Sequence, residues 1–211
     1  MRDKGEETSV IFLRHGQAAS PEDQLYAAGD GPGLAAEGHE HAEALARWLK
    51  GIHLDALYVS PTRRTRETAA PAAAAMDLRP VEIAGLRERG FGAWDGLAFD
   101  EVARRDPTGY GAWKADPVAF RPPAGESITD LQARVVSAVT GLLARHPGGL
   151  IAVVTHAGPI RVAVAHALEM PLNPYRGLTI PPGSATRVNY GTVSGQPNLI
   201  YLGVRPYNTQ P

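Results

Sequence analysis

The chain alternates between short apolar runs and longer stretches in which apolar residues recur with a helical period. The apolar runs are rich in strand-forming residues and cover residues 10–13, 56–59, 81–83 and 150–155. They are mostly continuous rather than alternating, which is typical of strands buried on both faces of a parallel sheet. Two further runs, 185–190 and 199–204, flank a turn with Gly195, Pro197 and Asn198, and predict an antiparallel hairpin at the sheet edge.

Several stretches between these runs place apolar residues three and four positions apart, as on one face of a helix. The clearest sets are Ala42, Leu45, Ala46 and Leu49, and Ile128, Leu131, Val135, Val139 and Leu142. Ser127 and Asp130 stand where a capping box would begin the second helix. Residues 62–76 and 158–168 also predict helices, and we expect Pro71 to kink or end the first of them. Two stretches rich in glycine and proline, 28–33 and 116–125, predict long loops.

Strands that alternate with helices predict βαβ units and a mainly parallel sheet covered on both faces. The expected fold class is α/β, a three-layer α/β/α sandwich whose central sheet has an antiparallel edge. The chain has 211 residues, which fits a single domain over residues 1–211. That edge also suggests a homodimer, because an unpaired strand can bind a second copy.

Composition narrows the classes of function. Apolar residues make up 44% and charged residues 20% of the chain, which indicates a globular protein. The net charge of -1 favours neither nucleic acid nor an anionic membrane as a partner. The absence of cysteine excludes disulfides, thiolate catalysis and cysteine-bound zinc. Residues 1–9 are largely polar and the run 10–13 is too short for a signal core, so we expect a cytoplasmic protein.

Polar residues follow each predicted parallel strand, where open α/β sheets bind their ligands. They are Arg14, His15 and Gly16; Ser60, Arg63 and Arg64; Arg87, Glu88 and Arg89; and Thr155, His156 and Ala157. Imidazole can accept a phosphoryl group, arginine forks hold phosphate oxygens, and a carboxylic acid can protonate a leaving oxygen. A glycine after the nucleophile permits close approach of the phosphate. The set therefore predicts phosphoryl transfer.

Each of these residues also has a structural interpretation when taken alone. The Arg14–His15 pair suits a surface strand end, and His156 suits a hydrogen-bonded core position. Arg63, Arg64, Arg66 and Glu67 suit a solvated helix face, and Glu88 suits a surface ion pair. The phosphoryl-transfer hypothesis is favoured because all of these alternatives would have to hold together.

In this order, the motifs resemble those of the histidine phosphatase superfamily, which includes the cofactor-dependent phosphoglycerate mutases. The matching blocks are residues 12–16, 34–38, 60–69, 86–96, 123–127 and 154–161. The family's Arg-His-Gly corresponds to Arg14-His15-Gly16. The departures from the family pattern stand beside the matched catalytic positions, at Gln17, Thr62, Thr65 and Glu67.

The resemblance implies a phosphoglycerate mutase-like fold and a metal-independent phosphatase without a cofactor. His15 would be the nucleophile, Glu88 the general acid, and Arg14, Arg64 and His156 the groups that hold the phosphoryl oxygens. Gly16, Gln17 and Ala157 would complete the substrate-binding set. The substrate would be a small phosphorylated metabolite, such as a sugar phosphate, phosphoserine, phosphoglycerate or a nucleotide-loop intermediate. Alternatives are a phosphoglycerate mutase, disfavoured by the short segment 94–126, and a non-catalytic phosphate-binding protein.

Two further groups of residues are left with open or minor roles. Five residues either line the pocket or serve the surface and packing: Arg87, Arg89, Trp94, Arg121 and Arg161. The remaining histidines lack comparable neighbours and are expected at the surface: His39, His41, His53, His146 and His166.

Overall fold

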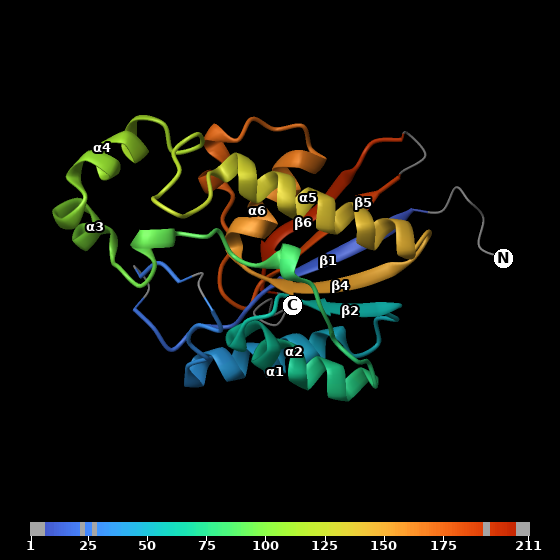
Figure 1. Cartoon of the computed structure of the whole chain (residues 1–211). Helices are drawn as coiled ribbons and strands as arrows, with labels where there is room; N and C mark the ends of the chain where they lie inside the picture. The colour runs from blue at the N-terminus through green and yellow to red at the C-terminus, as the bar shows by residue number, and fades with distance from the viewer. Residues whose placement is uncertain (1–6, 22–23, 27–28, 192–194, 206–211) are drawn as a thin grey trace.

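A mixed six-stranded sheet forms the centre of the computed structural model, which describes residues 7–21, 24–26, 29–191 and 195–205 (Figure 1). The strand order is β3-β2-β4-β1-β5-β6. The parallel part consists of β1 (Thr8–Arg14), β2 (Ala56–Val59), β3 (Val81–Glu82) and β4 (Leu150–Thr155). The antiparallel edge consists of β5 (Ala185–Tyr190) and β6 (Asn198–Val204). The predicted hairpin and sheet type are confirmed, although part of its turn, at 192–194, lies outside the described residues.

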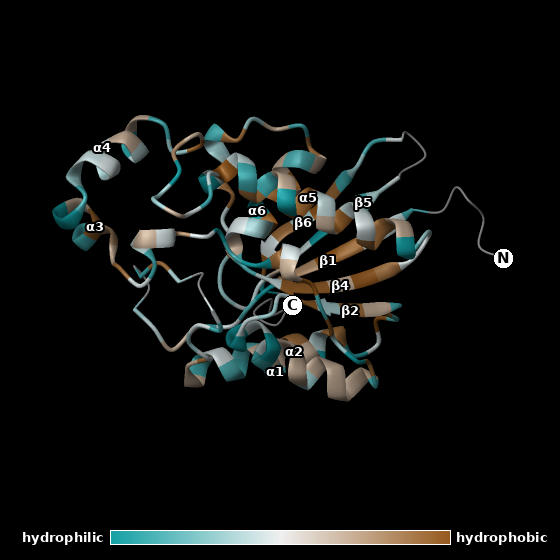
Figure 2. Ribbon diagram, in the orientation of Figure 1, coloured by the Kyte–Doolittle hydropathy of each residue, from teal (hydrophilic) through white to brown (hydrophobic). Residues whose placement is uncertain are grey.

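Helices cover both faces of the sheet (Figure 1). Helices α1 (Ala36–Leu49) and α2 (Arg63–Met76) lie on one face, and α5 (Ile128–Arg145) and α6 (Ala157–Ala167) lie on the other. Strand β1 shows why its sequence is continuously apolar: Val10 and Phe12 belong to the core with α5 and α6, whereas Ile11 and Leu13 belong to the core with α1 and α2. Figure 2 shows the resulting hydrophobic centre. The predicted three-layer sandwich is confirmed.

Local signals for helix ends had mixed outcomes. The capping box of α5 is present, since Asp130 N–H donates to Ser127 Oγ at 3.1 Å and Ser127 N–H donates to Asp130 Oδ2 at 2.8 Å. Pro71 does not end its helix, because α2 continues to Met76, and a kink at Pro71 stays a prediction. Alanine-rich turns on either side of the proline favour helix, and they bury Ala69 and Ala72 against the sheet.

Two helices were not predicted from the sequence, α3 (Phe99–Arg105) and α4 (Pro107–Ala115). They lie at one end of the molecule, away from the sheet (Figure 1). We call residues 91–120 the cap. Its small aromatic core includes Trp94 stacked on Phe120, with ring centroids 5.0 Å apart. The pattern missed these helices because α3 buries only Val102 and α4 buries no residue.

Short 3-10 helices complete the described fold: η1 (Ala84–Leu86), η2 (Gly92–Trp94) and η3 (Asn173–Gly177). Within the described residues, no helix has both the length and the apolar character needed to cross a bilayer. Because β1, β2 and β4 run parallel, their carboxyl ends meet at one edge of the sheet. The loops after these ends face the cap and form the site described next.

Candidate active site

Two histidines meet where neighbouring strands end. The register of β1 and β4 pairs Arg14 with Thr155, and His15 N–H donates to the Thr155 carbonyl at 3.0 Å. His156 follows directly and is the N-cap residue of α6. The two rings therefore lie edge to face, with centroids 5.2 Å apart. The parallel pairing of β1 with β4 therefore brings His15 and His156 together, although they are far apart in the sequence.

The His15 ring is held in one tautomer. Its Nδ1 donates to the carbonyl of Gly16 at 2.7 Å, because a carbonyl can only accept. The other nitrogen, Nε2, keeps its lone pair and accepts a bond from Arg64 Nε at 3.3 Å. Burial lowers the pKa of His15 well below its usual value, and the positive charges of Arg64 and Arg14 lower it further. His15 is therefore neutral at neutral pH, with an unprotonated Nε2.

Arg64 joins the two histidines. It lies in the first turn of α2, and its side chain is buried. Besides contacting His15, it donates from Nη2 to His156 Nδ1 at 3.1 Å and to the carbonyl of Tyr26 at 3.1 Å. Burial lowers the pKa of Arg64, while the carboxylates of Glu88 and Asp95 raise it. The side chain remains a cation, since an arginine pKa starts far above neutral pH.

His156 is completely buried behind this arginine. Its Nδ1 accepts from Arg64, so its proton is on Nε2, which donates to Ser60 Oγ at 2.9 Å. Burial, followed by the charge of Arg64, lowers the pKa of His156 well below its usual value. His156 is thus neutral and fixed by two hydrogen bonds.

Glu88 lies where η1 leads into the cap, against the first turn of α6. Its Oε2 accepts from Gly158 N–H at 3.2 Å, and its Oε1 accepts from Arg89 N–H at 2.9 Å. A side chain at position 158 would overlap Oε1, since a Cβ built there falls on the carboxylate. Gly158 is therefore required for Glu88 to lie in this position.

A network around Arg134 of α5 fixes the loop that carries Glu88. Its guanidinium donates to the carbonyls of Gly85 and Arg87, both at 3.0 Å, and to the carbonyl of Glu88 at 3.3 Å. It also pairs with Glu126 at 2.7 Å, and Glu126 accepts from Gly90 N–H at 2.8 Å. Sequence reasoning missed Arg134, although the matched block 123–127 contains its partner Glu126.

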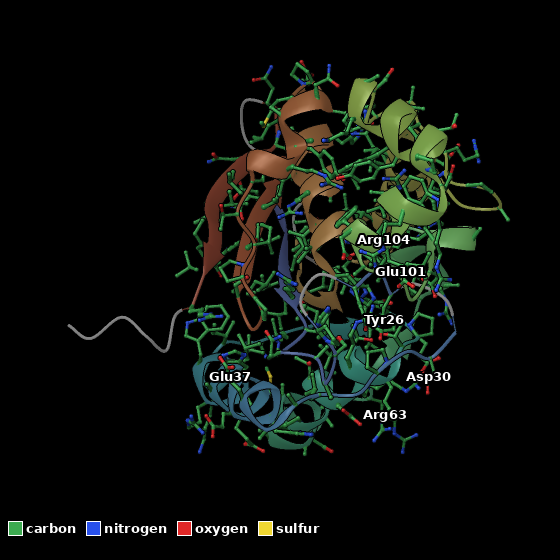
Figure 3. The ribbon with its side chains drawn as sticks, turned by 90° about the vertical axis from the view of Figure 1, so that its left-hand side faces the viewer. Tyr26, Asp30, Glu37, Arg63, Glu101 and Arg104 are labelled. Atoms are coloured by element: carbon green, nitrogen blue, oxygen red, sulfur yellow. The ribbon has the colours of Figure 1, made fainter. Side chains whose placement is uncertain are left out.

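A cavity of about 640 Å³ opens over these groups. Six of the predicted residues line it: Arg14, His15, Gln17, Arg64, Glu88 and Ala157. Figure 3 looks onto this end of the molecule, where in this view Tyr26, another lining residue, lies between Arg104 of α3 and Arg63 of α2. The geometry thus presents a neutral imidazole nitrogen, two arginines and a carboxyl group to one space, an arrangement suited to phosphoryl transfer.

Comparison with known proteins agrees with this geometry. Residues 10–201 match the model of a family described as the histidine phosphatase superfamily (branch 1). The chain belongs to this superfamily. A bifunctional protein of Mycobacterium tuberculosis is 35% identical over 167 residues, or 79% of this chain. The match covers only 46% of that relative, so this chain spans about half the length of the first curated proteins it matches.

Other relatives of this histidine phosphatase superfamily member are matched over most of their length. Phosphoserine phosphatase 1 of Hydrogenobacter thermophilus is 28% identical over 166 residues, which cover 79% of each chain. The solved structure of YhfR from Bacillus stearothermophilus has a TM-score of 0.85 and 26% identity, and covers 93% of this chain and 96% of its own. These likenesses establish the family and the phosphoglycerate mutase-like fold, and include a phosphatase among the relatives.

Two residues predicted to bind substrate do not line the cavity of this superfamily member. His156 is separated from it by its contact with Arg64. The Gly16 amide donates to Thr68 Oγ1 at 3.0 Å, and a Cβ at Gly16 would overlap the backbone of Gly38. This close approach of two backbones explains the glycine, and its contact with phosphate stays a prediction.

The residues left open by the sequence divide into two groups. Arg89 and Arg161 line the cavity. The others have contacts outside it: Arg87 donates to the Gly29 carbonyl, Trp94 lies in the cap core, and Arg121 pairs with Asp130. Sequence reasoning missed several lining residues because they lie in the cap, in η3 or in the loop after β1: Ser20, Gln24, Tyr26, Phe91, Phe99, Tyr175 and Arg176.

The surface expectation for the remaining histidines was wrong for His41. This side chain is buried on α1, on the face that also carries Leu45. His146 is half-buried, and its Nε2 is 2.8 Å from the Tyr58 hydroxyl. The other three are exposed as expected: His39, His53 and His166.

Proposed function

We propose that this protein is a phosphatase that hydrolyses a small phosphorylated metabolite through a phosphohistidine intermediate on His15. The observation that carries the proposal is the state of the His15 ring. Its Nδ1 is occupied by the Gly16 carbonyl, and its unprotonated Nε2 lies at the cavity beside Arg64. A neutral imidazole nitrogen held next to a fixed cation is the arrangement that attack on a phosphate ester requires.

In the first step, the hydrogen bond from Arg64 Nε to His15 Nε2 opens, Nε2 attacks phosphorus in line, and the bond to the ester oxygen breaks. Arg14 and Arg64 balance the charge on the phosphoryl oxygens, so the step needs no metal. Glu88 donates a proton to the leaving oxygen, which departs as an alcohol. His156 supports this step through Arg64, whose Nη2 it holds. Direct contact between His156 and phosphate stays a prediction, and requires that hydrogen bond to open.

In the second step, water replaces the alcohol. The Glu88 carboxylate, now deprotonated, takes a proton from water while the water oxygen bonds to phosphorus. The bond to His15 Nε2 breaks, which releases inorganic phosphate and restores the neutral ring. A phosphoglycerate mutase would share the first step and return the phosphoryl group to a sugar acid.

The test compares His15→Ala with the native protein on p-nitrophenyl phosphate in the presence of a chelator. We expect kcat to fall at least about a thousandfold, because no other neutral imidazole is placed to attack. Acid-labile, alkali-stable phosphate should be trapped on the native protein and not on the variant. His53→Ala, which changes an exposed histidine outside the cavity, is the matched control and should keep full activity.

Three outcomes would contradict the proposal. Unchanged hydrolysis in His15→Ala would show that His15 is not the nucleophile and that the measured hydrolysis has another source. Loss of activity with chelator would show a metal requirement. Rapid conversion of 3-phosphoglycerate to 2-phosphoglycerate without free phosphate would identify a mutase.

A further inference from the structure

The cavity carries more positive charge than a phosphate ester needs. Among its described lining residues are five arginines and a single carboxylate. Arg14 and Arg64 are placed beside His15 and serve the phosphoryl group, leaving Arg89, Arg161 and Arg176 with no such role. Three further cations around one cavity repel each other, so their presence points to a negatively charged part of the ligand.

Two of the three surplus arginines are already occupied by the protein. Arg89 donates from Nε to the Glu126 carbonyl at 2.8 Å and from Nη2 to the Phe120 carbonyl at 2.9 Å. Arg176 is exposed and lies over the ring of Trp113, 5.0 Å from its centroid, at the contact between η3 and the cap. Their contacts tie the cap to the body of the molecule.

Arg161 differs from both. It is half-buried on α6, and its Nε donates to the carbonyl of Leu178 at 2.8 Å. Among the residues that the structure describes, no other acceptor contacts its guanidinium and no carboxylate forms an ion pair with it. Burial lowers the pKa of Arg161, which shows that the charge is held at a cost, and the neighbouring Glu88 and Tyr175 raise it. Its two terminal nitrogens are free to bind an anion as a fork.

The position of Arg161 relative to Glu88 indicates which part of the ligand Arg161 would contact. Glu88 accepts from the amide of Gly158, and Arg161 lies three residues further along the same helix. Residues three apart share a helix face, and both Gly158 and Arg161 line the cavity. The charge of Glu88 also raises the pKa of both Arg64 and Arg161. A leaving alcohol protonated by Glu88 would therefore carry its next substituents along this face of α6, where Arg161 lies.

We propose that Arg161 binds a second anionic group on the leaving alcohol, so that the preferred substrates are phosphate monoesters of anionic alcohols. This inference rests on the proposed phosphatase function and adds its substrate class. The second anion is a carboxylate or another phosphate, since either suits the two free nitrogens of a guanidinium fork.

The experiment uses pairs of phosphate monoesters. One member of each pair carries a second anionic group, and the other carries an uncharged group in its place. For a carboxylate the pair is 3-phosphoglycerate and glycerol 3-phosphate, and for a second phosphate it is fructose 1,6-bisphosphate and fructose 6-phosphate. We expect the native protein to prefer the anionic member of at least one pair by tenfold or more in kcat/KM, a ratio typical of a charged hydrogen-bonded contact.

Arg161→Gln should remove this preference. We expect kcat/KM to fall about tenfold on the member with the second anionic group and to change less than about twofold on the member without it. Arg161→Lys should keep part of the preference, because the charge remains while the fork is lost. Arg104→Gln removes a positive charge from exposed α3 outside the cavity and should leave the ratio unchanged.

The possible failures are distinguishable. No native preference in either pair, or an equal loss on both members in Arg161→Gln, would overturn the inference and leave the phosphatase function standing. An equal loss would show that Arg161 acts only by holding η3 through Leu178. Absence of hydrolysis of every ester by the native protein would overturn the proposed function, and this inference with it.

Discussion

At the scale of single residues, the chemistry of the site depends on groups kept neutral among cations. His15 and His156 are both buried beside Arg64, and burial is the main cause that lowers the pKa of each. A histidine at ordinary exposure would be partly protonated at slightly acidic pH. In this site, protonation of His15 would block its attacking nitrogen, so the depressed pKa extends the pH range in which it can act.

The pH profile of kcat/KM tests this electrostatic argument. A lowered pKa keeps His15 unprotonated as pH falls through the usual histidine value, so activity should persist below about pH 6.5 and fall only at lower pH. A p-nitrophenyl phosphate assay from pH 4 to 8, together with NMR titration of the histidine ring protons, measures both quantities. An acid limb at or above pH 6.5, with His15 titrating there, would contradict the burial effect.

Gly158 gives a second prediction at this scale. In Gly158→Ala the new methyl group displaces the Glu88 carboxylate, which is the mobile end of a side chain and can turn away. The free energy of unfolding should change by less than about 1 kcal/mol, because alanine favours helix. On alkyl phosphates kcat/KM should fall about tenfold or more, because the acid is misplaced.

The leaving group provides the control for Gly158→Ala. p-Nitrophenolate departs without a proton, so hydrolysis of p-nitrophenyl phosphate should suffer much less than hydrolysis of alkyl phosphates. Equal losses on both substrates would show that Glu88 is not the proton donor. Thermal unfolding of the same preparations checks that the variant remains folded.

At the scale of elements, the segment from η1 to η2 is held in place by the neighbouring helix α5. Arg134 of α5 donates to three carbonyls of this loop and pairs with Glu126, which in turn holds the Gly90 amide. Loops without such ties are free to move, whereas this one is fastened directly behind Glu88. We assign Arg134 a positioning role.

Arg134→Met is the corresponding test. We expect kcat to fall at least about tenfold on alkyl phosphates, with a loss of about 2 kcal/mol in the free energy of unfolding, because half-buried carbonyls and Glu126 lose their partner. Arg104→Met, which breaks the exposed pair with Asp100 on α3, is the control and should leave the free energy of unfolding and kcat nearly unchanged. A variant with native activity on alkyl phosphates would refute the positioning role.

The elements also show where sequence reasoning succeeded. Continuous apolar runs and helical spacing predicted the main sheet and α1, α2, α5 and α6, because both patterns record burial. The helices of the cap lack such a pattern in their sequence, since α3 buries only Val102 and α4 buries no residue. Consequently Phe91 and Phe99 of the cap were not recognised as lining residues. Residue types that follow strands predicted Arg14, His15 and Arg64 at the cavity, but not which polar group each one contacts.

At the scale of the whole molecule, one sheet organises every part of the site. The described residues form a single six-stranded sheet, while the assignment of residues 1–211 to one domain stays a prediction. The same holds for the homodimer and the cytoplasmic location. β6 is the last strand of the sheet, and its free edge is where a second copy would pair.

The pairing of β1 has a consequence for synthesis of the chain. Both neighbours of this early strand come late, because Ser9 pairs with Leu150 on one side and with Asn189 on the other. While the ribosome extends the chain, the apolar strand β1 precedes both of its strand partners, so it is exposed to self-association until β4 and β5 have emerged.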